Sequence, residues 1–210
     1  MTRLVILGTR TLAVELADVI SEIPGHEVTA FVENMDPARC REPLEGLPVL
    51  WVDALAGMEV QAVCGLATTH RRLYVEQVRA LGVPFATLAH PTARVSRTAT
   101  LGEGCLISPF ANVSAHTMLD EHVFVNRGVL IGHHTRIGAY CTLQPGANIA
   151  GMVSIGARTY IGMGAVIRDN ITIGEGCVVG AGSVVTKDLP DRVLAVGVPA
   201  VVVKKDIEGK

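Results

Sequence analysis

The sequence is poor in aromatic residues, with one Trp, three Tyr and four Phe among 210 residues. Because 49% of the residues are hydrophobic, a sizeable core must be mainly aliphatic, which favours a regular architecture with little room for rings. No apolar run reaches the ~18 residues that a transmembrane helix needs. The net charge of −2 gives no basic surface, so neither nucleic acid nor a membrane is expected as a partner.

Cysteine pairs of the metal-binding or redox type are also missing. The five cysteines include no Cys-x-x-Cys motif and their number is odd, which predicts free thiols in a reducing cytoplasm. The first eight residues hold one basic residue and a short apolar run, with no small-residue cleavage site after it. We therefore expect a buried first strand there rather than a signal peptide.

Residues 1–90 alternate between strand-like and helix-like segments, which predicts a small parallel three-layer α/β domain of the Rossmann-like type. Pro24-Gly25 ends the first predicted helix, and Gly82 followed by Pro84 ends the second. The segment 34–43 is expected to be a loop. The predicted strands and helices are, in chain order, strand 4–7, helix 10–22, strand 27–32, strand 60–64, helix 70–81 and strand 85–88.

From residue 95 the hydrophobic period changes to six. Sixteen consecutive hexads, from Val95 to Val185, carry an aliphatic residue at the same position, and glycine often follows it. Three hexads make one triangular coil, and coils stack at the ~4.8 Å spacing of β-strands. The aliphatic side chains point inward, and the glycine is expected to permit the corner. The pattern predicts a parallel β-helix over 91–190, followed by a C-terminal extension at 191–210.

Three of the cysteines test this register, because Cys105, Cys141 and Cys177 are spaced by 36 residues, which is two coils. They therefore fall in one column, with Val123 and Thr159 between them. Two coil rises separate neighbouring thiols by about 10 Å, which is too far for a disulfide. We expect all three to be buried packing residues.

Several short motifs accompany the repeat. They are the strand and turn Leu4–Gly8, Phe31-Val32-Glu33-Asn34, His90-Pro91, Asn126 followed by His133, and Gly197-Val198-Pro199-Ala200. With the unbroken hexads, they resemble the hexapeptide-repeat sugar acetyltransferases of the sialic acid O-acetyltransferase and bacillosamine-pathway N-acetyltransferase type. The similarity covers nearly the whole chain. It implies a left-handed coil, a homotrimer, acetyl-CoA as co-substrate and no metal.

The resemblance also implies acetyl transfer by direct attack on acetyl-CoA, with the amine of a nucleotide-linked amino sugar as acceptor and a histidine as general base. The matching histidine is His133. An attacking nitrogen must lose a proton, and imidazole can take it near neutral pH. Asn126 is expected to orient the substrate or the imidazole, and His134 to assist.

The sequence departs from the family beside this histidine. A carboxylate usually flanks it, whereas the neighbours here are Gly132 and His134. A second imidazole can accept a hydrogen bond but supplies no fixed negative charge. Asp120 and Glu121 are candidates to bring a carboxylate from elsewhere in the prism or from another subunit.

Two further sets of site residues follow from the resemblance. Backbone contacts to acetyl-CoA are expected near Thr142, Gly151, Gly162, Ala181 and Pro199. A family histidine that approaches the cofactor is replaced here by Thr142. The nucleotide-sugar is expected to contact Gly8, Thr9, Arg10, Glu33 and Asn34. Of the family's glycine-rich turn only Gly8 remains, and Arg10 either pairs with a phosphate or blocks the pocket.

Three alternatives stay open. Within the class, the acceptor could be a sugar hydroxyl. Outside catalysis, the altered turn and the missing carboxylate suit a non-catalytic trimeric binding module. A zinc hydratase of the γ-carbonic anhydrase type would need His116, His122 and His134 to converge on a metal. His116 and His134 are one coil apart and should stack, but the spacing from His116 to His122 is six residues rather than that family's five.

Overall fold

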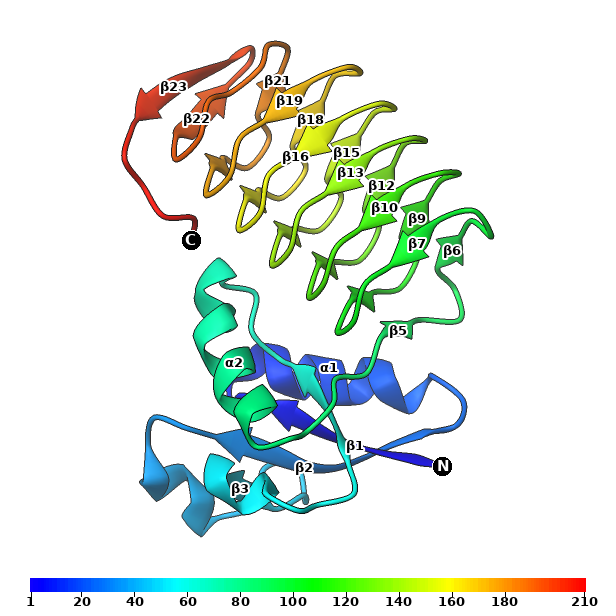
Figure 1. Ribbon diagram of the computed structural model, residues 1–210, viewed down its shortest axis with the longest axis vertical. Coiled ribbons are helices and arrows are strands. Elements are labelled where there is room, and N and C mark those ends of the chain that lie inside the picture. The colour runs from blue at the N-terminus through cyan, green and yellow to red at the C-terminus, as the bar shows by residue number, and fades with distance from the viewer. The chain divides into compact units, whose positions relative to one another are not determined.

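The computed structural model describes residues 1–210, which divide into two compact units (Figure 1). The first unit comprises residues 1–67 and 71–87, and the second comprises residues 68–70 and 88–210. None of the helices has the length and apolar character needed to span a lipid bilayer.

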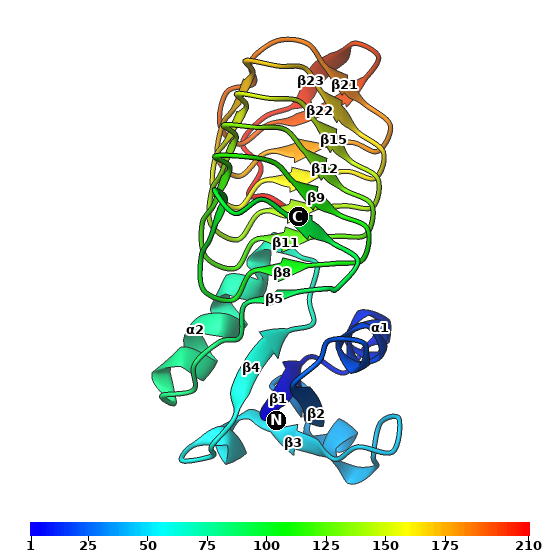
Figure 2. The ribbon, with the colours of Figure 1, turned by 90° about the vertical axis from the view of Figure 1, so that its right-hand side faces the viewer.

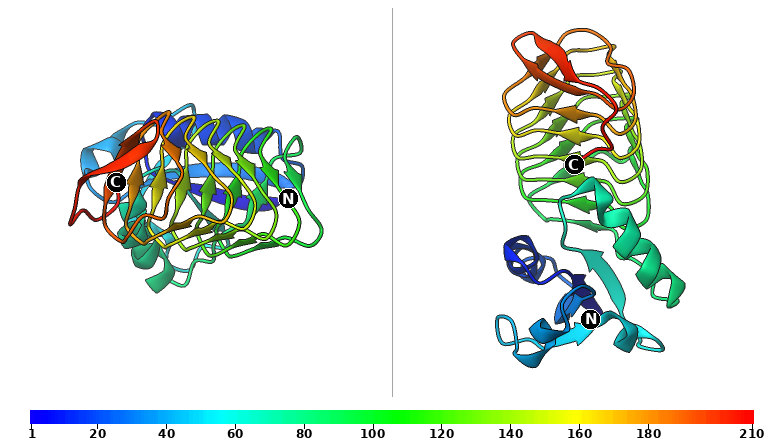
Figure 3. Two further views of the ribbon diagram at one scale, coloured as in Figure 1. Left: turned by 90° about the horizontal axis from the view of Figure 1, so that it is seen from above. Right: turned by 90° about the vertical axis from the view of Figure 1, so that its left-hand side faces the viewer.

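The first unit is an α/β domain. Its elements are β1 (Thr2–Leu7), α1 (Thr11–Ser21), β2 (His26–Glu33), η1 (Pro37–Arg41), β3 (Val49–Trp51), η2 (Val52–Leu55), β4 (Gln61–Cys64) and α2 (Arg72–Ala80). The short helix η3 (Thr69–Arg71) precedes α2, and its first two residues belong to the second unit. The four strands are parallel and lie in the order β3-β2-β1-β4. The two α-helices lie on opposite sides of this sheet (Figure 2 and Figure 3). The crevice between β1 and β4 is therefore the point where the strand order reverses, which is the usual ligand position in such folds.

The predicted α/β domain is confirmed, with differences at its edges. β3 was not predicted, because a three-residue strand is too short for its hydrophobic period to be recognised. The predicted strand 85–88 is wrong as a member of this sheet, since Phe85 makes only an isolated bridge with Ala62. The segment 34–43 is not wholly a loop, because η1 begins after Asp36, which accepts a hydrogen bond from the backbone of Ala38 at 3.0 Å.

The second unit is a prism of stacked triangular coils with three faces, visible in Figure 1. Each hexad from Val95 to Val185 contributes one two-residue strand, so the predicted sixteen-hexad left-handed β-helix is confirmed. The six-stranded face contains β6 (Arg94–Val95), β9 (Asn112–Val113), β12 (Leu130–Ile131), β15 (Asn148–Ile149), β18 (Val166–Ile167) and β21 (Val184–Val185). The five-stranded face contains β7 (Thr100–Leu101), β10 (Met118–Leu119), β13 (Arg136–Ile137), β16 (Ser154–Ile155) and β19 (Thr172–Ile173).

The eight-stranded face extends the prism beyond both ends of the repeat. It contains β5 (Leu88–Ala89), β8 (Leu106–Ile107), β11 (Phe124–Val125), β14 (Thr142–Leu143), β17 (Tyr160–Ile161), β20 (Val178–Val179), β22 (Leu194–Gly197) and β23 (Ala200–Lys204). β5 pairs with β8 one hexad before Val95, where the small side chain of Ala89 occupies the aliphatic position. β22 continues the face after Pro190, and β23 folds back on it in antiparallel orientation.

The core of the prism is the column of hexad aliphatics. From Ile107 to Val185 each of them is at most 3% exposed, and burying one such side chain contributes about 1.5–3 kcal/mol. The predicted cysteine column is also confirmed. Cys105, Cys141 and Cys177 are buried, and each thiol lies 3.0 or 3.1 Å from a corner carbonyl oxygen of the following coil. All five cysteines of the chain are free thiols.

The glycine that directly follows the aliphatic residue was expected to permit the corner, but it has a different role. The left-handed backbone falls three residues after the aliphatic, where His116, His134 and Tyr140 have φ of 57–59°. The glycine directly after the aliphatic instead makes room for the next coil, because a Cβ on Gly132 would lie 2.4 Å from the backbone nitrogen of Gly151. That glycine therefore sets the close stacking of the coils and not the direction of the turn.

Candidate active site

Three types of corner connect the faces of the prism, and each holds a different set of side chains. The histidine corner joins the six-stranded to the five-stranded face and comprises residues 114–117, 132–135 and 150–153. The glycine corner joins the eight-stranded to the six-stranded face and comprises residues 126–129, 144–147, 162–165 and 180–183. The acidic corner joins the five-stranded to the eight-stranded face and comprises residues 102–105, 120–123 and 138–141.

The histidine corner brings three imidazoles together. Nδ1 of His133 lies 3.1 Å from Nδ1 of His134, and the two rings meet edge to face with centroids 5.2 Å apart. His116 lies against His134 of the following coil, as predicted, with ring centroids 4.7 Å apart and ring planes inclined by 39°. All three residues are exposed. The corner therefore presents imidazole nitrogens to the outside of the prism.

The next coil fixes the place of the His133 ring. A Cβ on Gly151 would lie 2.9 Å from both Cε1 and Nε2 of His133, which is closer than carbon atoms normally approach. The missing side chain of Gly151 thus makes room for the imidazole. The backbone of the two coils is joined beside it, where the nitrogen of Met152 donates to the carbonyl of His133 at 2.8 Å.

Asn126 lies at the glycine corner, on the same coil as His133 but at a different vertex of the triangle. Its side chain is buried and its Oδ1 accepts a hydrogen bond from the backbone of Arg127 at 2.8 Å. A single chain therefore does not bring Asn126 to the predicted base.

The predicted cofactor residues are divided between elements. Gly151 is at the histidine corner, whereas Gly162 and Ala181 are at the glycine corner, where a Cβ on Gly162 would lie 2.6 Å from the nitrogen of Ala181. Pro199 lies in the turn between β22 and β23. Thr142 is fully buried on the eight-stranded face. The six-stranded face is thus bordered on one side by His133 and on the other by the glycine corner.

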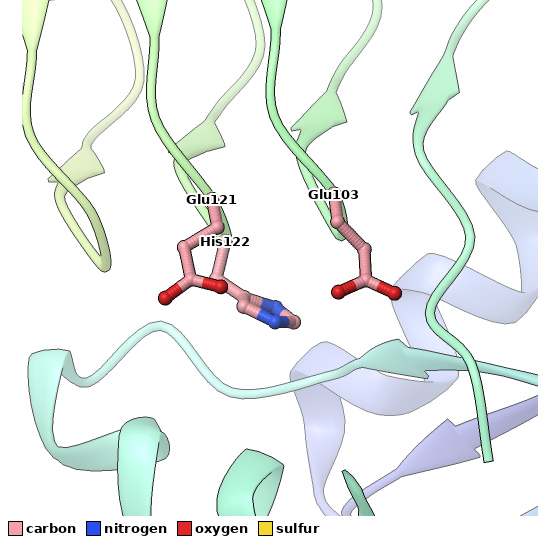
Figure 4. A group of neighbouring side chains, drawn as sticks. All are labelled: Glu103, Glu121 and His122. Atoms are coloured by element: carbon pink, nitrogen blue, oxygen red, sulfur yellow. The ribbon is translucent and has the colours of Figure 1, made fainter. Parts of the chain in front are cut away.

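Both candidate carboxylates of the prism lie away from the histidine corner. Asp120 and Glu121 are at the acidic corner, where Glu103, Glu121 and His122 gather with ligand atoms all within 4.8 Å of one another (Figure 4). Such a cluster was not predicted from the sequence. Each of its three residues takes part in an interaction within the folded chain.

The geometry excludes a zinc site built from the three histidines of one chain. His116 and His134 share the histidine corner, but His122 is at the acidic corner, where its ring stacks on Tyr140 with centroids 5.1 Å apart. A hydratase needs three imidazoles that converge on one metal. This arrangement does not provide them.

The first unit gathers the predicted substrate residues at the carboxyl ends of β1 and β2. Gly8 has φ of 107° and donates its N–H to the carbonyl of Val32 at 2.8 Å, which turns the chain out of β1. Thr9 Oγ1 then donates to Glu33 Oε2 at 2.5 Å. Asn34 does not join them, because its amide bonds Gln77 of α2 at 2.9 Å.

Glu33 is held as a carboxylate although it is only 8% exposed. Burial alone would raise its pKa, but hydrogen bonds from Thr9 and from the backbone of Met35, Asn34 and Asp36 outweigh burial and hold the pKa below its ordinary value of 4.5. The side chain thereby fastens the turn after β2 to the turn after β1. Its oxygens are occupied by these donors.

Arg39 in η1 is a candidate site residue that sequence reasoning missed. It donates to Thr9 Oγ1 at 3.4 Å, and its Nε lies 3.9 Å from Glu33 Oε2. Two open grooves of about 540 and 410 Å³ adjoin it, both lined by Thr9, Arg39 and Leu44, the larger also by Arg10. In the sequence, Arg39 is a basic residue in the segment after the second strand. Because that segment was predicted to be a loop, there was no reason from the sequence to place Arg39 near Thr9 or Glu33.

A Thr9→Val variant is expected to destabilise the first unit by about 1–2 kcal/mol at neutral pH, because Glu33 loses a charge-assisted hydrogen bond. The pKa of Glu33 is lowered in the folded chain, so its contribution is present above 4.5 and is lost as the pH falls through the folded-state value. The penalty should therefore shrink in acid. Urea unfolding at neutral pH and well below pH 4.5 measures it.

Thr29→Val is the matched control, because Thr29 Oγ1 donates to a backbone carbonyl, that of Leu4, at 3.1 Å and not to a carboxylate. Its effect should not change with pH. Equal pH dependence of the two variants would contradict this account of Glu33.

Known proteins of similar structure match this chain over nearly its full length. The family model described as bacterial transferase hexapeptide (six repeats) matches residues 152–187. A histidine-to-asparagine variant of perosamine N-acetyltransferase from Caulobacter crescentus, in complex with CoA and GDP-perosamine, is 30% identical, with 98% of each chain covered and a TM-score of 0.90. No curated protein sequence matches significantly.

Two further solved structures are similar to this chain over nearly its full length. The acetyltransferase domain of PglB from Neisseria gonorrhoeae, in complex with acetyl coenzyme A, is 28% identical over 96% of this chain and 98% of that one, with a TM-score of 0.88. WeeI from Acinetobacter baumannii is 25% identical over 97% of this chain and 100% of that one, also with a TM-score of 0.88. The chain belongs to the hexapeptide-repeat sugar acetyltransferases. It is an acetyltransferase, and its co-substrate is acetyl-CoA.

Proposed function

We propose that this enzyme transfers the acetyl group of acetyl-CoA to the amine of a nucleotide-linked amino sugar. The observation that carries the proposal is the full-length similarity to a perosamine N-acetyltransferase whose structure holds CoA and GDP-perosamine. The first unit supports it, because the carboxyl ends of its parallel strands are where nucleotides bind in such folds. The two grooves at Thr9 and Arg39 lie at that edge.

In the proposed reaction the acceptor nitrogen attacks the thioester carbonyl carbon directly, and Nε2 of His133 takes the proton that the nitrogen loses. The tetrahedral oxyanion would be stabilised by backbone N–H groups. Collapse breaks the carbon–sulfur bond, and the thiolate of CoA leaves and takes the proton from His133. The products are an amide and free CoA. His134 assists the base, and Asn126 of a second copy orients the substrate.

The proposed enzyme is a homotrimer in which each site is shared by two copies. The six-stranded face exposes Leu130 and Val166, which are 45% and 40% exposed, and Met152 and Met163 are 51% and 58% exposed at its two corners. Apolar side chains in this number suit a subunit interface. A threefold arrangement with this face inward would set the glycine corner of one copy against the histidine corner of the next.

Acetyl-CoA would then lie in the groove between these corners. Its expected contacts are Gly151 of one copy with Gly162 and Ala181 of the next, and Pro199 at the end of the groove. Thr142, which is buried on the eight-stranded face, would contribute packing beneath the groove rather than a direct side-chain contact. The free cysteines are compatible with a cytoplasmic location.

The nucleotide-sugar would place its phosphates near Arg10 and Arg39 beside the amino end of α1, where positive charge and backbone N–H groups favour anions. Gly8 lets the chain approach the ligand closely, and Thr9 with Glu33 fixes the turn. Asn34 supports the same edge through its bond to α2.

A substrate panel tests the proposal. Nucleotide-linked amino sugars, the same sugars without nucleotide, and nucleotide-linked sugars with only hydroxyl acceptors would each be incubated with acetyl-CoA while thiol release is followed. Turnover confined to the first set supports the proposal. Turnover with hydroxyl acceptors instead supports O-acetylation. Binding of CoA without turnover of any acceptor would favour the binding module.

A further inference from the structure

The histidine corner orients its exposed base without a carboxylate. Nδ1 of His133 lies 3.1 Å from Nδ1 of His134. The carboxylates of Asp120 and Glu121 belong to the acidic corner, at another vertex of the triangle. Within one chain, the group that faces the inner nitrogen of His133 is therefore a second imidazole.

A hydrogen bond between two imidazole nitrogens holds a single proton, and its position decides which tautomer each ring adopts. If the proton is on Nδ1 of His133, then Nε2 of His133 keeps its lone pair and can act as a base. If the proton is on Nδ1 of His134, then His133 carries its proton on Nε2 and cannot accept another there. The pair therefore controls whether His133 is catalytically competent.

We propose that His134 is a positioning residue that does the work of the absent carboxylate: its Nδ1 accepts the Nδ1–H of His133 and fixes the base tautomer, while His116 holds the His134 ring. The inference rests on the proposed function. After Nε2 of His133 takes the proton of the attacking amine, the imidazolium still donates through Nδ1–H to His134. When the CoA thiolate removes the Nε2 proton, the starting arrangement returns.

His116 completes the arrangement from the preceding coil. The backbone nitrogen of His134 donates to the carbonyl of Ala115 at 2.9 Å, and that of His116 donates to Thr98 Oγ1 at 3.0 Å. Both residues have the same left-handed backbone, with φ of 58° and 57°. Their rings lie in contact, with centroids 4.7 Å apart and planes inclined by 39°, so His116 supports the His134 ring from the preceding coil.

Two substitutions at one position separate the hydrogen bond from the packing. His134→Phe keeps a ring against His116 but removes the acceptor, and it should lower kcat about 10–100-fold with little change in KM, the usual effect of losing a group that orients a histidine. His134→Glu supplies a carboxylate acceptor and should recover most of the wild-type kcat. Wild-type kcat in His134→Phe, or equal impairment in both variants, would overturn the proposal.

Nitrogen-15 NMR of the histidine side chains reads the tautomer in the full-length protein without any turnover. Native His133 should be protonated at Nδ1 and unprotonated at Nε2, and His134→Phe should shift it toward the opposite tautomer. Native His133 protonated at Nε2 would overturn the proposal. If the expected tautomer is found but no acceptor is acetylated, the proposed function fails while the positioning by His134 stands.

Discussion

Replacing His133 with alanine is expected to lower kcat for acetyl transfer by about 10²–10⁴-fold, the usual contribution of a general base. Its imidazole is exposed at the histidine corner, it is oriented by His134 at 3.1 Å, and the bare backbone of Gly151 lies against its Nε2 edge. Because the ring is not part of the core, its loss should leave the fold and the affinity for CoA unchanged. Steady-state thiol release and CoA binding on the same preparation measure both.

The matched control is His70→Ala, which removes another exposed imidazole far from the histidine corner in sequence. This variant should have wild-type kcat. Turnover of His133→Ala within about threefold of wild type would show that the acceptor amine is deprotonated by another group or by the solvent, and the base assignment would be withdrawn.

Leu130→Glu is expected to separate the proposed trimer into monomers and to reduce activity at least about a hundredfold, because an unpaired carboxylate would be buried in the subunit interface. Leu130 is on β12, near the middle of the six-stranded face, between Asn112 and Asn148 of the adjoining strands. Its side chain points away from the core and is 45% exposed in the single chain. Sedimentation velocity and thiol release together measure the result.

Met118→Glu supplies the control for this prediction. Met118 occupies the corresponding outward position of β10 on the five-stranded face and is 40% exposed. The same charge there should leave the trimer and its activity intact. A trimeric and active Leu130→Glu variant would contradict the proposed interface, and dissociation of Met118→Glu instead would move it to the five-stranded face.

The sequence was sufficient for the prism because each hexad repeats the same requirement. An aliphatic residue must fill the inside of every coil, so an error at one position would not hide the period. The ends of the prism were less predictable. Ala89 is in register with the aliphatic column but is small and exposed, and β22 pairs with β20 without belonging to the repeat. Those strands are defined by their hydrogen-bonded pairing with a neighbouring strand, and this pairing cannot be predicted from the spacing of hydrophobic residues.

The candidate site was predictable only in part, for a related reason. His133 was found because it follows a short motif. The spacing of one coil between His116 and His134 correctly predicted that these two residues lie against each other. The corner on which each residue falls decides which side chains can meet, however, and this separated Asn126 and Glu121 from His133 within one chain. Arg39 was missed because its bond to Thr9 joins residues 30 positions apart with no repeat between them, and its nearer contact with Glu33 follows no recognisable motif.

A substitution at the glycine corner can test whether two copies of the chain complete each active site. Gly164 has φ of 64° and a Cβ there would contact nothing within 4 Å. Tyr140 adopts the same left-handed backbone at the acidic corner, with φ of 59°. A Gly164→Tyr variant should therefore fold, while its ring would fill the proposed groove for acetyl-CoA.

The decisive measurement is the activity of trimers assembled from equal amounts of His133→Ala and Gly164→Tyr chains, each inactive alone. In random mixing, about a quarter of the sites combine an intact His133 from one copy with an intact glycine corner from the next. Recovery of about a quarter of wild-type turnover is expected. Turnover no greater than that of the two parent variants would contradict a site shared between subunits.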